Sequence, residues 1–595
     1  LQTLVDGSYA AESCRGDDRW RDSCAFVPGG PGFTLPAGAI FKQSYNAYLA
    51  QPAYAATSSA QSWFTAVAVS DEYNFDPANG TVLLGRLKTE FVYGDGFGNP
   101  TQTTETTLPC ADPCPNFLTQ KTTTTNYTNI SGDPNKWWLG RLNESTINFA
   151  RRDPDTLQVS QDTRKASFTY ELGNDPSEGA KAGAVKSERN QACVTTPCAS
   201  GDANASLDIR TLYDTDPFGN RVRSYTCSGD LSDAGCRNLA ILEFQPGFQG
   251  NGSIGPPSRR VHRTLRTEYD SNGRFVVATW QPYFDPTVPQ RRYTERRSME
   301  VLARDEFGEP THVRDALGLD TWTRRGEFGR EFATESEAGA RSETRYRWCI
   351  GVNGATGGNG GVSCPARADV RFRVESKSNL APTRWTYFDL LGRELLTVSE
   401  TFNIGVSGQD MSATCTDYDR YSRKVRTSEP FFLPGTAALS GPAFASDPCA
   451  NPSFVASQSF DALGRLKSLT GPDNAITTVV FQGLTQVKTL PCNNSAAQQI
   501  CNRTWSETRN VAGELIAATD ANGFTVHHRY DVYGHTTRII RDAGGGSIVS
   551  LSVYDKLGRV TRSEDPDRGV WTFEYNAAGE RIRSVDARGV AIEEH

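Results

Sequence analysis

The fold is decided by the stretch Tyr554-Asp555-Lys556-Leu557-Gly558-Arg559-Val560, which returns along the chain. Tyr530-Asp531-Val532-Tyr533-Gly534 and Tyr575-Asn576-Ala577-Ala578-Gly579 align with it at Tyr, at Asp or Asn, and at Gly. An Asp can accept hydrogen bonds from backbone N–H groups across a turn, and Gly adopts positive φ without strain. A second Asp group follows each copy, for example ten residues on at Asp565. This beat predicts a turn about every ten residues, with strands of roughly 5–7 residues between the turns.

The segments between these turns alternate in polarity, as strands with one packed face do. In Val570–Tyr575, the side chains of Trp571, Phe573 and Tyr575 fall on one face, opposite Thr572 and Glu574. The pattern predicts antiparallel hairpins that bury one face.

Further units are visible upstream, although they become less regular before residue 265. The residues predicted to form the repeat turns are Tyr269, Asp270, Gly273, Asp389, Gly392, Asp461, Gly464, Tyr530, Asp531, Gly534, Tyr554, Asp555, Gly558, Tyr575, Asn576 and Gly579. Weaker copies occur at Asp216–Asn220 and Asp95–Asn99.

These units resemble the RHS/YD-repeat family, and the resemblance is clear over residues 265–595. The part before it resembles the middle region of SpvB/TcdB-type toxin proteins, through Trp138-Leu139-Gly140-Arg141-Leu142 and Phe97-Gly98-Asn99-Pro100-Thr101. The resemblance implies an all-β fold, in which a long antiparallel hairpin sheet spirals into a hollow, cocoon-like shell. It implies three regions: an N-terminal β region (1–90), a degenerate repeat region with disulfide-stapled loops (91–264) and an incomplete YD-repeat shell (265–595).

Composition excludes several classes of protein. The chain has 595 residues, too many for one ordinary core, and 62 basic residues nearly balance 69 acidic ones. No basic block predicts nucleic-acid binding, and no apolar run is long enough to span a membrane. The chain begins at Leu1 rather than Met and stops at His595 inside a repeat. We therefore expect it to be processed, or to be part of a longer polypeptide.

The 14 cysteines fall into seven neighbouring pairs, mostly in loop-like stretches. We predict the disulfides Cys14–Cys24, Cys110–Cys114, Cys193–Cys198, Cys227–Cys236, Cys349–Cys364, Cys415–Cys449 and Cys492–Cys501. The alternative is free thiols or a zinc site, but none of the pairs has the Cys-x2-Cys spacing that is typical of zinc sites. Seven disulfides that hold exposed loops favour a secreted or cell-surface location over the periplasm.

No catalytic, cofactor-binding or metal-binding residue is predicted. His527 and His528 are adjacent in a strand, so they point to opposite faces and cannot bind one metal together. The Gly-rich stretch 351–361 lacks the Gly-Lys-Ser/Thr of a phosphate loop. Gly-x-Ser-x-Gly and His-Glu-x-x-His do not occur.

The expected function is therefore that of a non-enzymatic shell or scaffold. The family resemblance implies that it encapsulates or presents a C-terminal effector, without a cofactor. An alternative is an extracellular adhesion or matrix protein that binds cells or polysaccharide. A third is a glycan-active enzyme, which requires two carboxylates about 5–10 Å apart in a cleft.

Overall fold

The fold was analysed in a computed structural model of the whole chain. The structure describes residues 2–3, 9–10, 42–52, 63–76, 79–111, 114–133, 136–171, 183–191, 208–228, 233–238, 262–284, 293–352, 360–401, 410–433, 442, 444–452, 454–461, 464–491, 502–543, 546–576 and 579–593.

The described elements are strands, with one α-helix and one 3-10 turn. In the first half they are β1 (Gln2–Thr3), β2 (Tyr9–Ala10), β3 (Lys42–Pro52), β4 (Trp63–Asp76), β5 (Asn79–Tyr93), β6 (Pro100–Leu108), β7 (Thr119–Asp133), β8 (Lys136–Arg152), β9 (Val159–Tyr170), β10 (Val185–Gln191), β11 (Ile209–Thr215), β12 (Arg221–Ser228), α1 (Asp233–Asn238), β13 (His262–Tyr269), β14 (Val276–Phe284), β15 (Tyr293–Arg304), β16 (Pro310–Asp315), β17 (Asp320–Arg325), η3 (Glu327–Gly329), β18 (Glu331–Ser336) and β19 (Arg341–Trp348). In the second half they are β20 (Phe372–Ser378), β21 (Arg384–Phe388), β22 (Glu394–Glu400), β23 (Met411–Tyr418), β24 (Lys424–Ser428), β25 (Phe431–Leu433), β26 (Val455–Phe460), β27 (Leu466–Thr470), β28 (Ile476–Gln482), β29 (Thr485–Pro491), β30 (Asn502–Arg509), β31 (Leu515–Thr519), β32 (Thr525–Tyr530), β33 (Thr536–Ala543), β34 (Gly546–Tyr554), β35 (Val560–Asp565), β36 (Gly569–Tyr575), β37 (Arg581–Val585) and β38 (Ala591–Glu593).

The strands form one continuous antiparallel meander. From β3 to β23 each strand pairs with the next in sequence. The same holds from β26 to β38. Among the described residues the sheet has 38 strands, and the pairing passes through residues 91 and 265, where the sequence pattern changes. The all-β hairpin-repeat fold is thereby confirmed.

The described part of the meander branches at β23. One edge of β23 pairs with β22, while its other edge pairs with β24 near Asp417 and with β25 near Ser412. β24 and β25 lie along the same edge of β23 and are separated by Glu429 and Pro430; β24 continues the pairing to β26.

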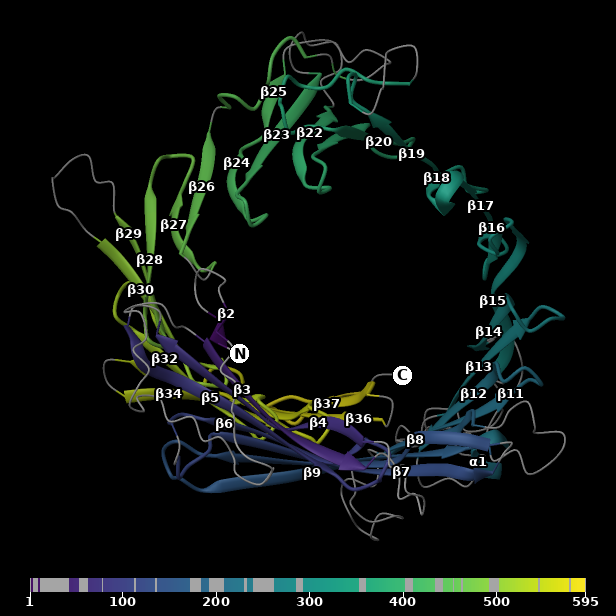
Figure 1. The fold of residues 1–595 in the computed structure, drawn as a ribbon, viewed down its shortest axis with the longest axis vertical. Coiled ribbons are helices and arrows are strands. Elements are labelled where there is room, and N and C mark those ends of the chain that lie inside the picture. Colours follow the sequence, from purple (N-terminus) through teal and green to yellow (C-terminus); the bar gives the residue numbers. More distant parts are fainter. Residues whose placement is uncertain are drawn as a thin grey trace.

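The sheet curves into an open ring that overlaps itself. Figure 1 shows β3–β9, in purple and blue, lying in the lower part of the ring together with the yellow-green strands β30–β37. Strand pairing does not join the two ends of the sheet within the described residues. We call β4–β9 the first winding, β28–β36 the second winding, and the contact between them the seam.

Strand length varies around the ring. Strands near the C-terminus have 5–9 residues up to β37, whereas β8 has 17. The ten-residue beat applies where Tyr-Asp units and the second Asp groups mark alternate turns, and the longer N-terminal strands lie where those marks are weak.

The densest core lies under β20–β23 rather than along the whole sheet. Tyr387 and Val398 are fully buried there, together with Leu396 and Met411. Residues from two insertions cover this face. The first insertion, between β19 and β20, contributes Cys349 and Val370, and the second, between β25 and β26, contributes Phe444 and Cys449. The insertions therefore supply a second layer that a single curved sheet lacks.

Candidate functional site: the repeat turns and the seam

The Asp of each repeat turn is held by the backbone that it caps. The Asp389 Oδ1 atom accepts hydrogen bonds from the backbone N–H groups of Leu391 and Arg393, both at 2.9 Å. The Gly392 N–H donates to the Asp389 carbonyl at 3.2 Å, and Gly392 has a φ of +75°. A register shift follows between Tyr387 and Phe388. This is a type I turn closed by a glycine bulge, which explains why the unit needs Asp first and Gly fourth.

An arginine directly after the glycine joins one unit to the next. The Arg393 Nε atom donates to Asp389 Oδ2 at 2.6 Å, and its Nη1 atom donates to the carbonyl of Asp419 in the next such unit at 3.2 Å. Its guanidinium lies 5.1 Å from the ring centroid of Tyr418. Each unit therefore helps to position the Tyr and Asp of its neighbour.

The same arrangement recurs along the ring. Arg423 contacts Asp419, the ring of Phe460 and the carbonyl of Asp461; Arg465 contacts Asp461 and the ring of Phe481; Arg559 contacts Asp555, the ring of Tyr575 and the carbonyl of Asn576. The sequence pattern assigned no role to these arginines, although an Arg directly follows Gly464 and Gly558.

The tyrosine hydroxyl ties each unit back to the preceding one. Tyr530 donates to the Leu515 carbonyl at 2.5 Å, Tyr554 to that of Thr536 at 3.0 Å and Tyr575 to that of Val560 at 2.9 Å. Phe can fill the same space, as Phe460 does, but it lacks the hydroxyl donor.

The remaining repeat-turn residues lie as follows. Tyr269 ends β13, and the Asp270 Oδ1 atom caps the backbone N–H groups of Arg274 and Phe275. Asp531 binds the ring of His535, which stacks 4.9 Å from Tyr554 and so takes the position of the arginine. The glycines Gly273, Gly464, Gly534, Gly558 and Gly579 all have positive φ.

The seam combines ion pairs with aromatic contacts. Asp155 of the first winding pairs with Arg529 of the second at 2.8 Å, and Asp162 pairs with Lys556 at 3.2 Å. The Tyr533 ring, at the tip of its repeat turn, packs 4.9 Å from Phe149. Repeat turns of the second winding thus rest on strands of the first.

A cavity of about 390 Å³ lies at the seam. Its lining includes Leu118, Asp153, Ile516, His528 and Tyr530. Burial lowers the pKa of His528, with a further contribution from His527. His527 itself lies 3.3 Å from Asp542. Within the described ranges, no three His, Cys, Asp or Glu side chains converge to hold a metal ion.

Four disulfides lie within the described residues: Cys110–Cys114, Cys227–Cys236, Cys349–Cys364 and Cys415–Cys449. The last three of these bonds belong to packed clusters rather than to exposed loop bases, because their buried cysteines include Cys227, Cys236, Cys349, Cys415 and Cys449. The pairs Cys14/Cys24, Cys193/Cys198 and Cys492/Cys501 lie outside the described residues.

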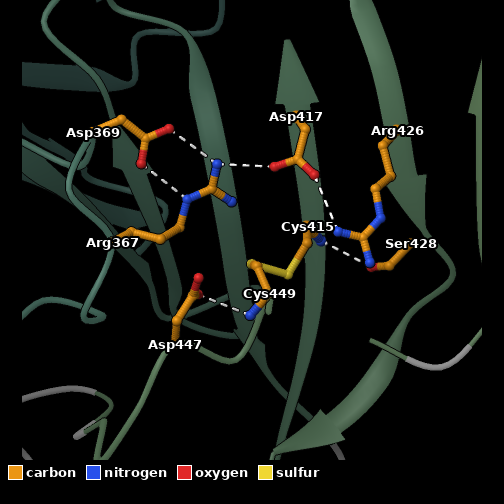
Figure 2. The surroundings of a disulfide bond; sticks show 8 residues. All are labelled: Arg367, Asp369, Cys415, Asp417, Arg426, Ser428, Asp447 and Cys449. Atoms are coloured by element: carbon orange, nitrogen blue, oxygen red, sulfur yellow. Dashed lines mark hydrogen bonds and ion pairs between the residues drawn. A yellow bond between two sulfur atoms is a disulfide. The ribbon is translucent and has the colours of Figure 1, made fainter. Parts of the chain in front are cut away.

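A charged network surrounds the Cys415–Cys449 bond (Figure 2). Arg367 binds Asp369 and also reaches Asp417 on β23 at 2.9 Å, and Asp417 in turn pairs with Arg426 on β24 at 3.3 Å. Burial alone would lower the pKa of Arg367, but the carboxylates of Asp369 and Asp417 raise it above its usual value. The network links the first insertion to the branch point of the sheet.

The turn aspartates predict that the ring is destabilised by acid. Backbone N–H donors hold the pKa of Asp270 below its usual range, and Arg588 does the same for Asp586. Partial burial opposes the shift at Asp419, but hydrogen bonds from Arg423 still lower its pKa. A lowered folded-state pKa stabilises the fold above the unfolded value of about 3.9, and this stability is lost as the pH falls through the folded-state pKa.

We therefore expect the urea midpoint to change little between about pH 7 and 5 and to drop steeply below about pH 4. Tyr and Trp fluorescence at each pH measures the midpoint. Asp270→Asn and Asp419→Asn together should make the acid limb shallower, because their titration is removed. An unchanged acid limb in this variant would contradict the assignment.

These features define the class of protein: a wall of β-hairpin repeats, in which each repeat turn positions its neighbour and successive windings stack at a seam. A family model of the RHS repeat matches residues 554–591. The match makes this segment similar to the RHS repeat, as its Tyr-Asp and Gly spacing predicts.

Solved structures support the same fold. The crystal structure of TcdB2-TccC3 without the hypervariable C-terminal region is similar with a TM-score of 0.61 and 12% identity, over 93% of this chain and 33% of that chain. A mutant Photorhabdus luminescens Tc holotoxin pore is similar with a TM-score of 0.57 and 11% identity, over 93% of this chain and 32% of that one. This chain spans about one third of the length of these two solved chains. No curated protein matches it by sequence.

Proposed function

We propose that this chain forms part of the wall of a hollow shell that encloses an effector segment. The observation that carries the proposal is the overlap of the ring, since a strip that stacks on itself can surround a volume. The role is mechanical, because the most regular contacts join neighbouring units and windings. The similar TcdB2-TccC3 structure is described as lacking a hypervariable C-terminal region, and the enclosed segment proposed here would correspond to that region.

We further propose that the stretches 1–90, 91–264 and 265–595 are three parts of one wall that differ in repeat regularity. The shell would be exported, because the disulfides require an oxidising compartment. Within the described residues, no helix is long and apolar enough to cross a membrane.

Limited proteolysis of the full gene product tests enclosure. Trypsin should leave a segment outside residues 1–595 intact while the shell is folded, and should cleave it after the wall is opened with urea. Mass spectrometry of the product from culture medium identifies the protected peptides. Equal cleavage before and after unfolding would overturn the proposal and favour the adhesion alternative, which needs no protected segment.

A further inference from the structure

Two repeat turns begin with Asn instead of Asp, and both carry Glu in place of the usual Arg. In each, the Asn amide donates to the Glu carboxylate at 2.7 Å: Asn510 to Glu514 Oε2, and Asn576 to Glu580 Oε2. The backbone geometry is otherwise that of the Asp units, with Asn510 Oδ1 accepting from the Ala512 and Glu514 N–H groups. The charge at the fifth position of the turn is therefore reversed, and the arginine that follows the glycine in an ordinary unit is replaced by Glu514 or Glu580.

In the first of these units, an arginine from the other winding fills the vacant role. Arg151, at the end of β8, binds Glu514 through both terminal nitrogens, with Nη1 to Oε1 at 2.8 Å. Its guanidinium lies 5.4 Å from the ring centroid of Tyr530, the tyrosine of the next unit. Arg393 occupies the equivalent place over Tyr418 in an ordinary unit.

The contact is buried on both sides. The Arg151 side chain is 8% exposed and that of Glu514 is 18% exposed, although 363 positions separate the two residues. Burial of Glu514 opposes ionisation, but hydrogen bonds from Arg151 and Asn510 hold its pKa below the usual range. A bidentate pair of this kind is far more specific than an exposed surface ion pair.

The second unit shows the same pairing in a more exposed place. Glu580 pairs with Arg263, which lies in β13 and is 317 positions away in sequence. Both charge-reversed units thus meet an arginine from a part of the ring more than 300 residues earlier.

We propose that the Asn-x-x-Gly-Glu units are binding sites for an arginine of an earlier part of the ring, Arg151 in the first winding and Arg263 in β13, and that they fix which earlier strands the later strands contact. In an ordinary Asp-Arg unit, the arginine that pairs with the turn carboxylate belongs to the same unit. In a charge-reversed unit, the arginine that pairs with the Glu comes from another part of the ring, so this pair forms only when the two parts are correctly stacked. This inference is independent of whether the shell encloses an effector.

Hydrogen exchange of the intact chain, followed by mass spectrometry, tests the proposal. Arg151→Ala should speed exchange at least about tenfold both in the β8–β9 turn (153–158) and in the 510–514 turn. The substitution removes the arginine from the first turn's strand and leaves the Glu514 carboxylate of the second turn without its partner. As a control, Arg559→Ala should affect residues 555–576 but not 510–514.

A rescue variant separates this mechanism from simple loss of packing. Asn510→Asp with Glu514→Arg converts the unit into an ordinary one that supplies its own arginine. Added to Arg151→Ala, this double change should return exchange of the 510–514 turn to the wild-type rate, while the 153–158 turn stays fast. If the 510–514 turn stays as fast as in Arg151→Ala alone, or if Arg151→Ala affects only β8–β9, the proposal is wrong.

Discussion

Replacing Cys415 and Cys449 with alanine is expected to destabilise the branch point of the sheet by about 3–4 kcal/mol on the chain-entropy model. The bond closes a loop with a sequence separation of 34, and both cysteines are buried. The loss exceeds that of an exposed loop staple, because the second insertion also covers the core residues Tyr387 and Met411.

The local contacts shown in Figure 2 explain why the insertion should detach as a unit. The Cys449 N–H donates to Asp447 Oδ1 at 2.9 Å, and the Cys415 N–H donates to the Ser428 hydroxyl at 2.9 Å. Without the disulfide, this layer would lose its covalent link to β23 and would depend on noncovalent contacts such as the packing of Phe444 against Tyr387.

Urea denaturation and hydrogen exchange of β21–β25 measure the effect. The matched control is Cys110→Ala with Cys114→Ala, since that bond has a separation of only 4 and lies outside the buried cluster. The model gives about 2 kcal/mol for so short a loop. Equal losses in the two variants would show that the buried cluster does not depend on the Cys415–Cys449 bond.

Asp389→Ala is expected to cost about 3–5 kcal/mol and to loosen the neighbouring unit as well. The Asp389 residue is 4% exposed, and the substitution leaves the Leu391 and Arg393 N–H groups without their acceptor. It also leaves the Arg393 guanidinium without its carboxylate, so the contacts of Arg393 with Tyr418 and the Asp419 carbonyl should weaken.

The urea midpoint and hydrogen exchange at residues 418–424 measure the two parts of this effect. Asp520→Ala is the control, because Asp520 also caps a turn, through Asn522 and Phe524, but does so at an exposed position. Asp389→Asn should recover part of the loss, since the Asn510 side chain accepts the same backbone hydrogen bonds in its own turn. If exchange at residues 418–424 were normal in Asp389→Ala, the units would be independent of one another.

The repeat fold could be predicted because its signals are local. Tyr554, Asp555 and Gly558 act within one turn, and the alternation of Trp571 and Phe573 reports one strand face. The role of Arg559 was harder to predict, because its second partner, Tyr575, lies in another unit.

The seam could not be predicted because its partners have no common period. Nothing near Arg151 marks it as a ligand for Glu514, and the reversed charge at Glu514 becomes meaningful only beside an ordinary unit such as Asp389–Arg393. The burial of Cys227 and Cys349 was also missed, because pairs that are close in sequence look the same whether they close an exposed loop or a core.

The reversed units also have a consequence for how such walls change in evolution. Successive units begin 21 to 24 residues apart, from Asn510 to Asp531 to Asp555 to Asn576. Because ordinary units complete one another, duplicating or deleting a whole unit preserves every local contact. It would nevertheless move Glu514 one unit away from Arg151. The Arg151–Glu514 pair would therefore fix the number of repeat units in one winding. A wall that gains or loses a repeat would keep this pair only if the charge-reversed unit also shifted by one position along the chain.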